Sequence, residues 1–146
     1  MAFTYQAVVD FMDRYFKTFS QYGQDLDNMH RMSEYFDSEL EFEQYYPDTP
    51  HVYGLENFHK LNDHPDIQET LTPELLVIDT EKKIASVLIS VNVKDTRSGK
   101  TFLTPTYNCI YHFKEYRDGS FKILKMSLFV EHSPEYEEFM TRLPKG

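Results

Sequence analysis

The sequence has no tryptophan, a single cysteine and no long hydrophobic run. One cysteine, Cys109, cannot form an intramolecular disulfide or supply the cysteine cluster of a structural zinc site. No segment reaches the length of a transmembrane helix. The first residues, MAFTYQAVVDFMDRYF, lack the basic start and apolar run of a signal peptide. These absences predict a protein of the reducing cytoplasm with no disulfide framework.

Basic residues are also scarce. The chain has 15 lysines and arginines against 24 aspartates and glutamates, a formal charge of −9, and the basic residues are scattered among acidic ones. Nucleic acids and anionic membrane surfaces carry the same sign of charge as the protein. The sequence therefore argues against both as partners.

Aromatic side chains, by contrast, are abundant. The 12 phenylalanines and 11 tyrosines bring aromatics to 16% of a chain of 146 residues that is 40% hydrophobic. This length suits one domain over residues 1–146, with a real hydrophobic core. So many rings predict either a core filled by large side chains or a cavity lined by them.

Hydrophobic spacings of three and four residues predict helices over residues 5–22, 25–36 and 55–63, and from Ser133 onward. Apolar–polar alternation predicts strands over residues 38–46, 69–79, 83–95, 104–116 and 121–132. The segment PDTPHVYG is expected to be a loop, and TRSGK and RDGS are expected to be hairpin turns. Asp25 is expected to cap the second helix. The order of elements indicates an α+β fold, with helices on one face of an antiparallel sheet.

Three segments carry a resemblance to a known superfamily: AVVDFMDRYFKTF, YFDSELEFEQYYPDTPHVYGLENF and IYHFKEYRDGSFKILKMSLFVE. Together with the order of elements, they resemble the nuclear transport factor 2-like superfamily, which includes the SnoaL-like cyclases and the ketosteroid isomerases. The resemblance covers most of the chain. It implies a cone, in which a strongly curved antiparallel sheet wraps around a long N-terminal helix.

The resemblance also implies roles for individual residues. Tyr15 follows an arginine and matches the catalytic tyrosine of the steroid isomerases, and Tyr111 matches the position of their second oxyanion donor. Gln44 stands where those enzymes have a carboxylate base, and an amide cannot take a proton. The acid of the SnoaL-like enzymes would fall near Ser127 or Leu128 and is missing. The catalytic candidates are therefore Tyr15, Tyr111 and Gln44, without a general base.

The stretch TPTYNCIYHF decides which side chains face the cone interior. Its odd positions, Tyr107, Cys109 and Tyr111, are expected to point inward, and Asn108 and His112 outward. The flanking strands have clear apolar faces, and a slip of one residue would bury the polar set instead. The side chains expected inside on these strands are Val87, Ile89 and Val91, and Leu124, Met126 and Leu128. The ligand-binding set that follows is Tyr15, Phe19, Phe42, Gln44, Phe58, Val91, Tyr107, Cys109, Tyr111 and Met126.

Each candidate also has an ordinary structural interpretation. Tyr15 also fits as a core tyrosine, and Cys109 as a small buried hydrophobe. Asp37 also fits as a strand-edge or capping residue, and alternation places Glu131 outside. The remaining histidines show no metal-ligand spacing, so we expect neither a metal nor a cofactor; they are His30, His51, His59, His64 and His132.

Three functions remain open at this point. The first is binding of a small apolar or aromatic molecule in a cone-shaped pocket. The second is an isomerase, dehydratase or cyclase acting on a small carbonyl or polyketide-like substrate, with a base still to be found. The third is a homodimeric interaction protein that pairs through the outer sheet face. The residues expected on that face are Asn108, Ile110, Ile123, Ser127 and Phe129.

Overall fold

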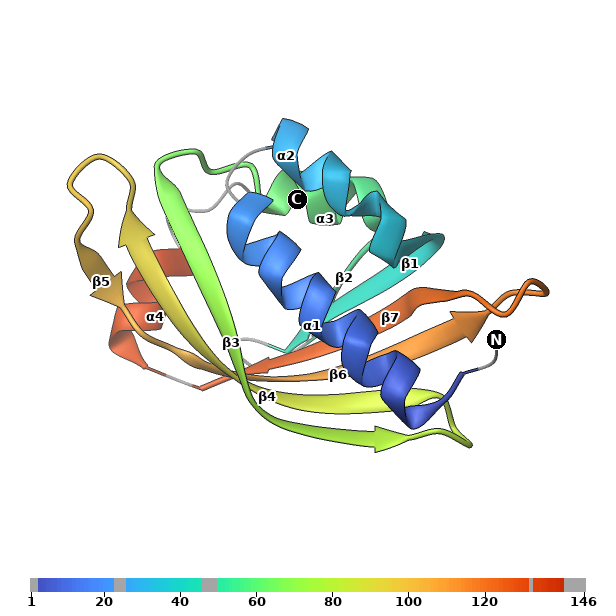
Figure 1. Cartoon of the computed structure of the whole chain (residues 1–146). Coiled ribbons are helices and arrows are strands. Elements are labelled where there is room, and N and C mark those ends of the chain that lie inside the picture. Colours follow the sequence, from blue (N-terminus) through green and yellow to red (C-terminus); the bar gives the residue numbers. More distant parts are fainter. Residues whose placement is uncertain (1–2, 23–25, 46–49, 132, 141–146) are drawn as a thin grey trace.

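The computed structural model describes residues 3–22, 26–45, 50–131 and 133–140 (Figure 1). Its helical elements are α1 (Tyr5–Tyr22), α2 (Leu26–His30), the 3-10 helix η1 (Arg31–Tyr35), α3 (Leu55–Leu61) and α4 (Pro134–Met140). Its strands are β1 (Phe36–Tyr45), β2 (Pro50–Tyr53), β3 (Ile67–Asp79), β4 (Ile84–Asp95), β5 (Thr101–Leu103), β6 (Thr106–Glu115) and β7 (Phe121–Val130).

Helix α1 matches its predicted bounds. The Thr4 hydroxyl oxygen accepts a hydrogen bond from the backbone N–H of Ala7 at 3.2 Å, which satisfies one of the free donors at the start of the helix. The predicted second helix is divided between α2 and η1, because the chain tightens into a 3-10 turn after His30. The expected cap of that helix, Asp25, lies outside the described residues.

The seven strands form one sheet in the order β2-β1-β7-β6-β4-β3, with β5 paired to β4. The sheet curves around α1, which crosses its concave face (Figure 1). The predicted cone of α+β class is thus confirmed. One pair departs from the antiparallel expectation, since β1 and β7 run parallel and the sheet is therefore mixed. These two strands are joined through the rest of the chain, so no hairpin forces them to be antiparallel.

Two short strands were missed from the sequence. The predicted loop PDTPHVYG contains β2, which pairs with β1 from Phe42↔Tyr53 to Tyr45↔Pro50. Proline is tolerated there because it is the first residue of an edge strand. Strand β5 follows the turn TRSGK and pairs with β4. Both predicted hairpin turns are present, with Gly99 and Gly119 at φ 73° and 88°, a region that glycine enters without steric cost.

A β-bulge in β7 changes which of its side chains face inward. Opposite β6, His112 pairs with Lys125 but Phe113 pairs with Ile123, so Leu124 is the extra residue. Ile123, expected on the outer face, is fully buried at 0% exposure, and Leu124, expected inside, is only half-buried. The expectation for both residues was wrong, because simple alternation along a strand fails across a bulge.

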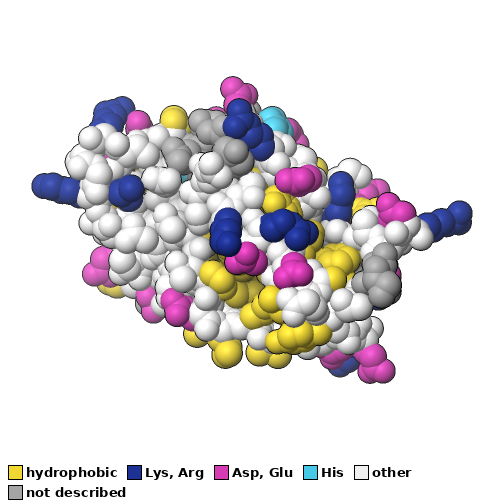
Figure 2. All heavy atoms as spheres, viewed as in Figure 1, with side chains coloured by type: hydrophobic (Ala, Val, Ile, Leu, Met, Phe, Trp, Pro, Cys, Tyr) yellow, Lys and Arg dark blue, Asp and Glu magenta, His cyan; other side chains and the backbone are white. Residues whose placement is uncertain are grey.

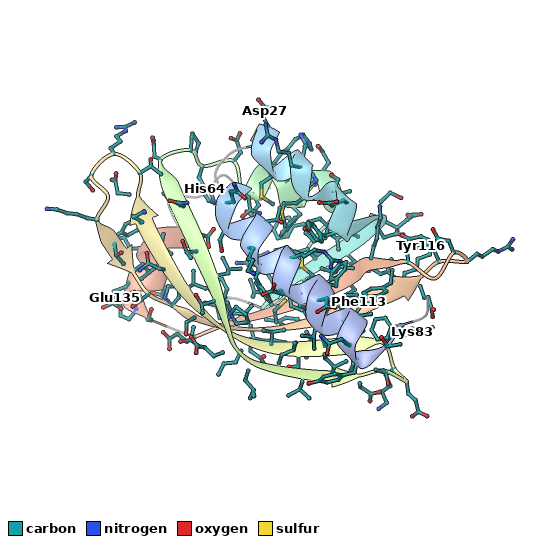
Figure 3. The ribbon with its side chains drawn as sticks, viewed as in Figure 1. Asp27, His64, Lys83, Phe113, Tyr116 and Glu135 are labelled. Atoms are coloured by element: carbon teal, nitrogen blue, oxygen red, sulfur yellow. The ribbon has the colours of Figure 1, made fainter. Side chains whose placement is uncertain are left out.

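Aromatic rings fill the end of the cone beneath the N-terminal half of α1. The Phe3 and Phe11 rings pack on Phe113 and Phe121, with ring centroids 4.9 to 5.5 Å apart. At this end Asp37 accepts a hydrogen bond from the Tyr116 hydroxyl, which ties β1 to the β6–β7 turn. In Figure 3, Tyr116 lies on the right of the view, and His64 lies left of centre near the C-terminal end of α1. The open space is left toward the His64 end.

The face of the molecule seen in Figure 2 is mostly polar and includes an apolar area. Figure 2 shows hydrophobic side chains gathered among charged ones in the lower part of this view. On α1 and β3, the exposed large apolar side chains are Tyr5, Leu75 and Val77. Within the described ranges, none of the helices has the length and hydrophobicity needed to span a membrane.

Candidate functional site

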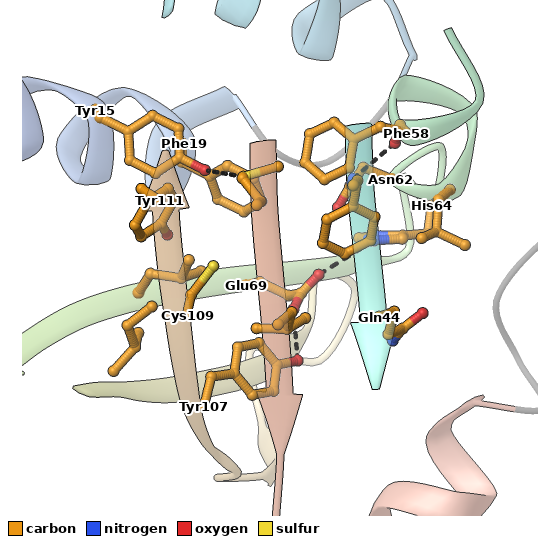
Figure 4. A pocket seen from close by; sticks show the side chains of 16 residues that line it. Tyr15, Phe19, Gln44, Phe58, Asn62, His64, Glu69, Tyr107, Cys109 and Tyr111 are labelled. Atoms are coloured by element: carbon orange, nitrogen blue, oxygen red, sulfur yellow. Dashed lines mark hydrogen bonds and ion pairs between the residues drawn. The ribbon is translucent and has the colours of Figure 1, made fainter. Parts of the chain in front are cut away.

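A pocket opens between the C-terminal half of α1, the concave face of the sheet and α3 (Figure 4). The volume of the pocket is about 70 Å³. An engineered cavity of about 150 Å³ holds one benzene molecule. The pocket therefore suits at most one small ring, part of which must lie at the opening. Its lining residues are Tyr15, Phe19, Phe42, Gln44, Phe58, Leu61, Asn62, His64, Glu69, Leu71, Ile89, Tyr107, Cys109, Tyr111, Met126 and Leu128.

The predicted inward face of β6 is confirmed. Tyr107, Cys109 and Tyr111 are buried and line the pocket, whereas Asn108 is exposed and His112 is half-buried near Lys125 and Glu43 on the outer face. The strand is held in this phase by β4 on one side and β7 on the other. The tyrosine side chains therefore belong to the interior of the cone.

Nine of the ten predicted ligand-binding side chains line the pocket. The exception is Val91, which is 3% exposed and faces the interior but contributes no pocket surface. Ile89, two residues earlier on the same face of β4, lines the pocket instead. Alternation fixes the face of a strand to which a residue belongs, but it does not fix how far along the strand a cavity extends.

The phenols of Tyr15 and Tyr111 meet beside Cys109. The Tyr15 hydroxyl lies 3.7 Å from the Met126 sulfur, and Tyr111 hydrogen-bonds to both Tyr15 and Cys109. Burial raises the pKa of both phenols far above their ordinary value and raises the pKa of the Cys109 thiol to about 12. All three groups are therefore protonated donors at neutral pH, and none is a base.

The polar part of the pocket is an unexpected pair, His64 and Glu69. Their side chains are 5% and 9% exposed, and Nε2 of His64 lies 3.4 Å from Oε1 of Glu69. The Tyr107 hydroxyl donates to Oε2 of Glu69, also at 3.4 Å. Nδ1 of His64 lies 3.2 Å from the backbone carbonyl oxygen of Ile67, so this nitrogen is the donor. Figure 4 shows Glu69 between His64 and Tyr107.

The charge of Glu69 controls the protonation of His64. Burial alone lowers the pKa of His64, but the negative charge of the nearby Glu69 raises it, and the net direction is upward. A raised pKa at a histidine beside a carboxylate favours the imidazolium form, whose charge is paired with the Glu69 carboxylate.

The sequence could have indicated Glu69 as a member of this pair, but not His64. Ile67, Glu69 and Leu71 are all buried, so alternation along β3 places Glu69 on an apolar face, where a carboxylate needs a partner. The predicted strand began at Glu69, so its alternation with Ile67 was not recognised. His64 gave no such signal, because it lies in the turn between α3 and β3 and only the fold brings its side chain to the pocket.

Two further amides line the pocket. Asn62 donates from Nδ2 to the backbone carbonyl of Phe58 at 2.9 Å, which holds it at the end of α3. Gln44 faces inward as predicted and is 4% exposed. Neither is a base, and both add polar surface near His64 (Figure 4).

The other sequence candidates lie outside the pocket. Glu131 is exposed, as alternation predicted. Asp37 accepts from the Tyr116 hydroxyl and, at 2.8 Å, from the backbone N–H of Glu39, which is a structural role near the strand start. Glu43, the acidic neighbour of Gln44 on β1, also lies outside the pocket, where it accepts from the Ser127 hydroxyl at 2.9 Å.

Two other histidines meet at α3. The rings of His30 and His59 lie 4.8 Å apart, and His30 Nε2 contacts the Glu56 carboxylate at 2.8 Å. Across the described part of the chain, no three histidine, cysteine, aspartate or glutamate side chains are grouped so that they could hold a metal ion.

Known proteins share the shape of this chain but little of its sequence. No protein-family model and no curated protein matches it. PrhC from Penicillium brasilianum superposes with a TM-score of 0.68 at 11% identity, over 94% of this chain and 87% of its own. A nuclear transport factor 2-like protein from Cytophaga hutchinsonii gives 0.61 at 16% identity, over 86% and 97%. This chain has the nuclear transport factor 2-like fold.

A third structure with this fold belongs to SalBIII, described as an epoxide hydrolase/cyclase-like enzyme in pyran ring formation in the polyether salinomycin. It superposes with a TM-score of 0.58 at 18% identity, over 86% of this chain and 92% of its own. At these identities the likeness establishes the nuclear transport factor 2-like fold alone, because this fold hosts unrelated activities. Function must be argued from the pocket.

Proposed function

We propose that this protein binds a small, mainly apolar or aromatic molecule inside the cone. The observation that carries the proposal is the pocket itself, which has aromatic and aliphatic walls and a few polar groups near His64 and Glu69. Small-molecule sites typically combine these two features. The volume of about 70 Å³ favours a single ring over a multi-ring ligand.

Toluene is a suitable probe, since it has seven non-hydrogen atoms and no polar group. We expect saturation-transfer NMR to detect toluene binding to the native protein. Leu128→Phe enlarges a half-buried lining side chain and should weaken binding at least tenfold. Leu88→Phe makes the same change on the outer face of β4, where Leu88 is 41% exposed, and should leave binding unchanged. No transfer in the native protein, or equal weakening by both variants, would contradict the proposal.

A second candidate function is proton-transfer catalysis, as in an isomerase, dehydratase or cyclase acting on a small carbonyl substrate. The specific observation in its favour is the His64–Glu69 pair, which offers the acid–base group that the sequence alone did not reveal. Protonated Tyr15 and Tyr111 supply donors for a developing oxyanion. SalBIII, with the same fold, is described as cyclase-like.

Exchange of the α-protons of cyclohexanone in D₂O tests this second function without a known substrate. We expect the protein to accelerate the exchange, and Glu69→Gln to abolish the acceleration. Glu41→Gln, an exposed glutamate on the outer face of β1, is the matched control and should keep it. If Glu69→Gln exchanges as fast as the native protein, the pair is not the base.

We also propose that two copies pair through the outer face of the sheet. Support comes from Val52 and Phe129, which are 58% and 40% exposed, and from Tyr45, whose ring stacks on Phe129 at a centroid distance of 4.5 Å. Ile123 no longer belongs to this surface, because the bulge in β7 turns it inward. Such a homodimer is compatible with either function of the pocket.

A further inference from the structure

We propose that the His64–Glu69 pair recognises a neutral hydroxyl group, so that the ligand of the pocket is a small phenol or cyclic alcohol. The inference rests on the proposed small-molecule binding and names the class of molecule. It starts from the gap between the two side chains. Their facing atoms are 3.4 Å apart, an ion-pair contact in which Nε2 of His64 makes no hydrogen bond.

The imidazole is the unsatisfied member of the pair. Nε2 of His64 is buried and makes no hydrogen bond within ordinary geometry. Nδ1 is fixed as the donor to the carbonyl of Ile67, so the second proton of an imidazolium must lie on Nε2, facing Glu69. Buried polar atoms without a partner are rare in proteins and often mark the place of a bound group.

A hydroxyl matches the two facing atoms better than other uncharged groups. One oxygen donates its proton to the Glu69 carboxylate and, through a lone pair, accepts from Nε2–H of His64. An ether or ketone oxygen can only accept and leaves Oε1 of Glu69 without a donor. A ligand carboxylate would place a second negative charge beside Glu69 at a buried site.

The rest of the pocket specifies the body of the ligand. Phe19, Phe42 and Phe58 line it together with aliphatic side chains, and these surfaces suit a ring. The volume of about 70 Å³ is smaller than the cavity of about 150 Å³ that holds benzene, so it leaves room for no more than one small ring. Tyr107, which donates to Oε2 of Glu69, leaves Oε1 to face the ligand.

Phenol and toluene have nearly the same shape and differ at one group, so their affinities test the inference directly. An apolar pocket prefers toluene, because the phenol hydroxyl loses its hydrogen bonds to water. With the pair acting as the hydroxyl site, calorimetric titration should show phenol binding at least tenfold tighter than toluene, as expected for a hydrogen bond to a charged group. Anisole, which keeps the oxygen but lacks the donor, should lose this advantage.

The variant Glu69→Gln should remove the preference for phenol while keeping toluene affinity within about twofold, and Glu41→Gln should behave as the native protein. If Glu69→Gln does not fold, the comparison of phenol with anisole in the native protein decides. Equal or weaker binding of phenol than of toluene overturns the inference but leaves the proposed function standing. Failure of all three probes to bind overturns both. Tighter binding of benzoate than of phenol contradicts the charge argument.

Discussion

The thiol of Cys109 offers a direct test of the pocket chemistry. Burial raises its pKa from an ordinary value of 9.0 to about 12, and its side chain is 2% exposed. The thiolate is the reacting form of cysteine. At pH 8 a rise of about three units lowers the thiolate fraction about a thousandfold. Alkylation by iodoacetamide should therefore be about a thousandfold slower at Cys109 than at an exposed cysteine.

The exposed reference is the variant Cys109→Ser with Ser98→Cys, which places a thiol in the turn before β5. Mass spectrometry of timed samples gives both rates. The native rate should rise about tenfold per pH unit from pH 7 to 10 without a plateau, because the thiol titrates only near pH 12, whereas the reference levels off near pH 9. Toluene in the pocket should slow the native reaction further. A native rate within tenfold of the reference at pH 8, or a plateau near pH 9, would refute the reasoning.

Three further predictions concern the frame around the pocket. Tyr116→Phe removes the hydroxyl that lowers the pKa of Asp37, and it should cost about 1.5–2 kcal/mol in urea unfolding at pH 7. A lowered carboxylate pKa stabilises the folded state at pH values above the unfolded pKa near 3.8, and this stabilisation is lost as the pH falls below it. The cost of Tyr116→Phe should therefore be smaller in acid than at pH 7. An equal cost in acid and at pH 7 would argue against this role of the hydrogen bond. Ile123→Ala should cost about 2–5 kcal/mol, whereas Leu88→Ala should cost less than about 1 kcal/mol; similar costs would mean that the bulge is misplaced. Phe129→Glu should convert a sedimenting dimer to a monomer, and a native monomer at micromolar concentration would contradict the dimer.

The sequence predicted the parts of this fold that rest on local periodicity. Helix α1 and the inward face of β6 follow from spacing alone, because each has a continuous apolar stripe and neighbours that fix its phase. Strand β2 escaped prediction because four residues beginning with proline carry no alternation to read. Its pairing with β1 is a tertiary contact.

The bulge and the polar pair could not be predicted for a different reason. The extra residue at Leu124 lets β7 bury both Ile123 and Met126, and the alternation within the strand does not mark its position. The contact of His64 with Glu69 depends on how the turn at Pro65 directs the chain into β3. Periodicity describes faces of elements, and it carries no information on where two elements meet.

The parallel pairing of β1 with β7 has a consequence for how the protein acquires its pocket. Phe42 pairs with Met126 and Gln44 with Leu128, and all four line the cavity. One wall thus joins an early strand to the last strand of the sheet, a contact of high sequence separation that forms slowly because a long loop must close first. We expect the cavity to be completed late in folding. A nascent chain must release β7 from the ribosome before it can bind a ligand, and a ligand that then fills the cavity stabilises the finished fold.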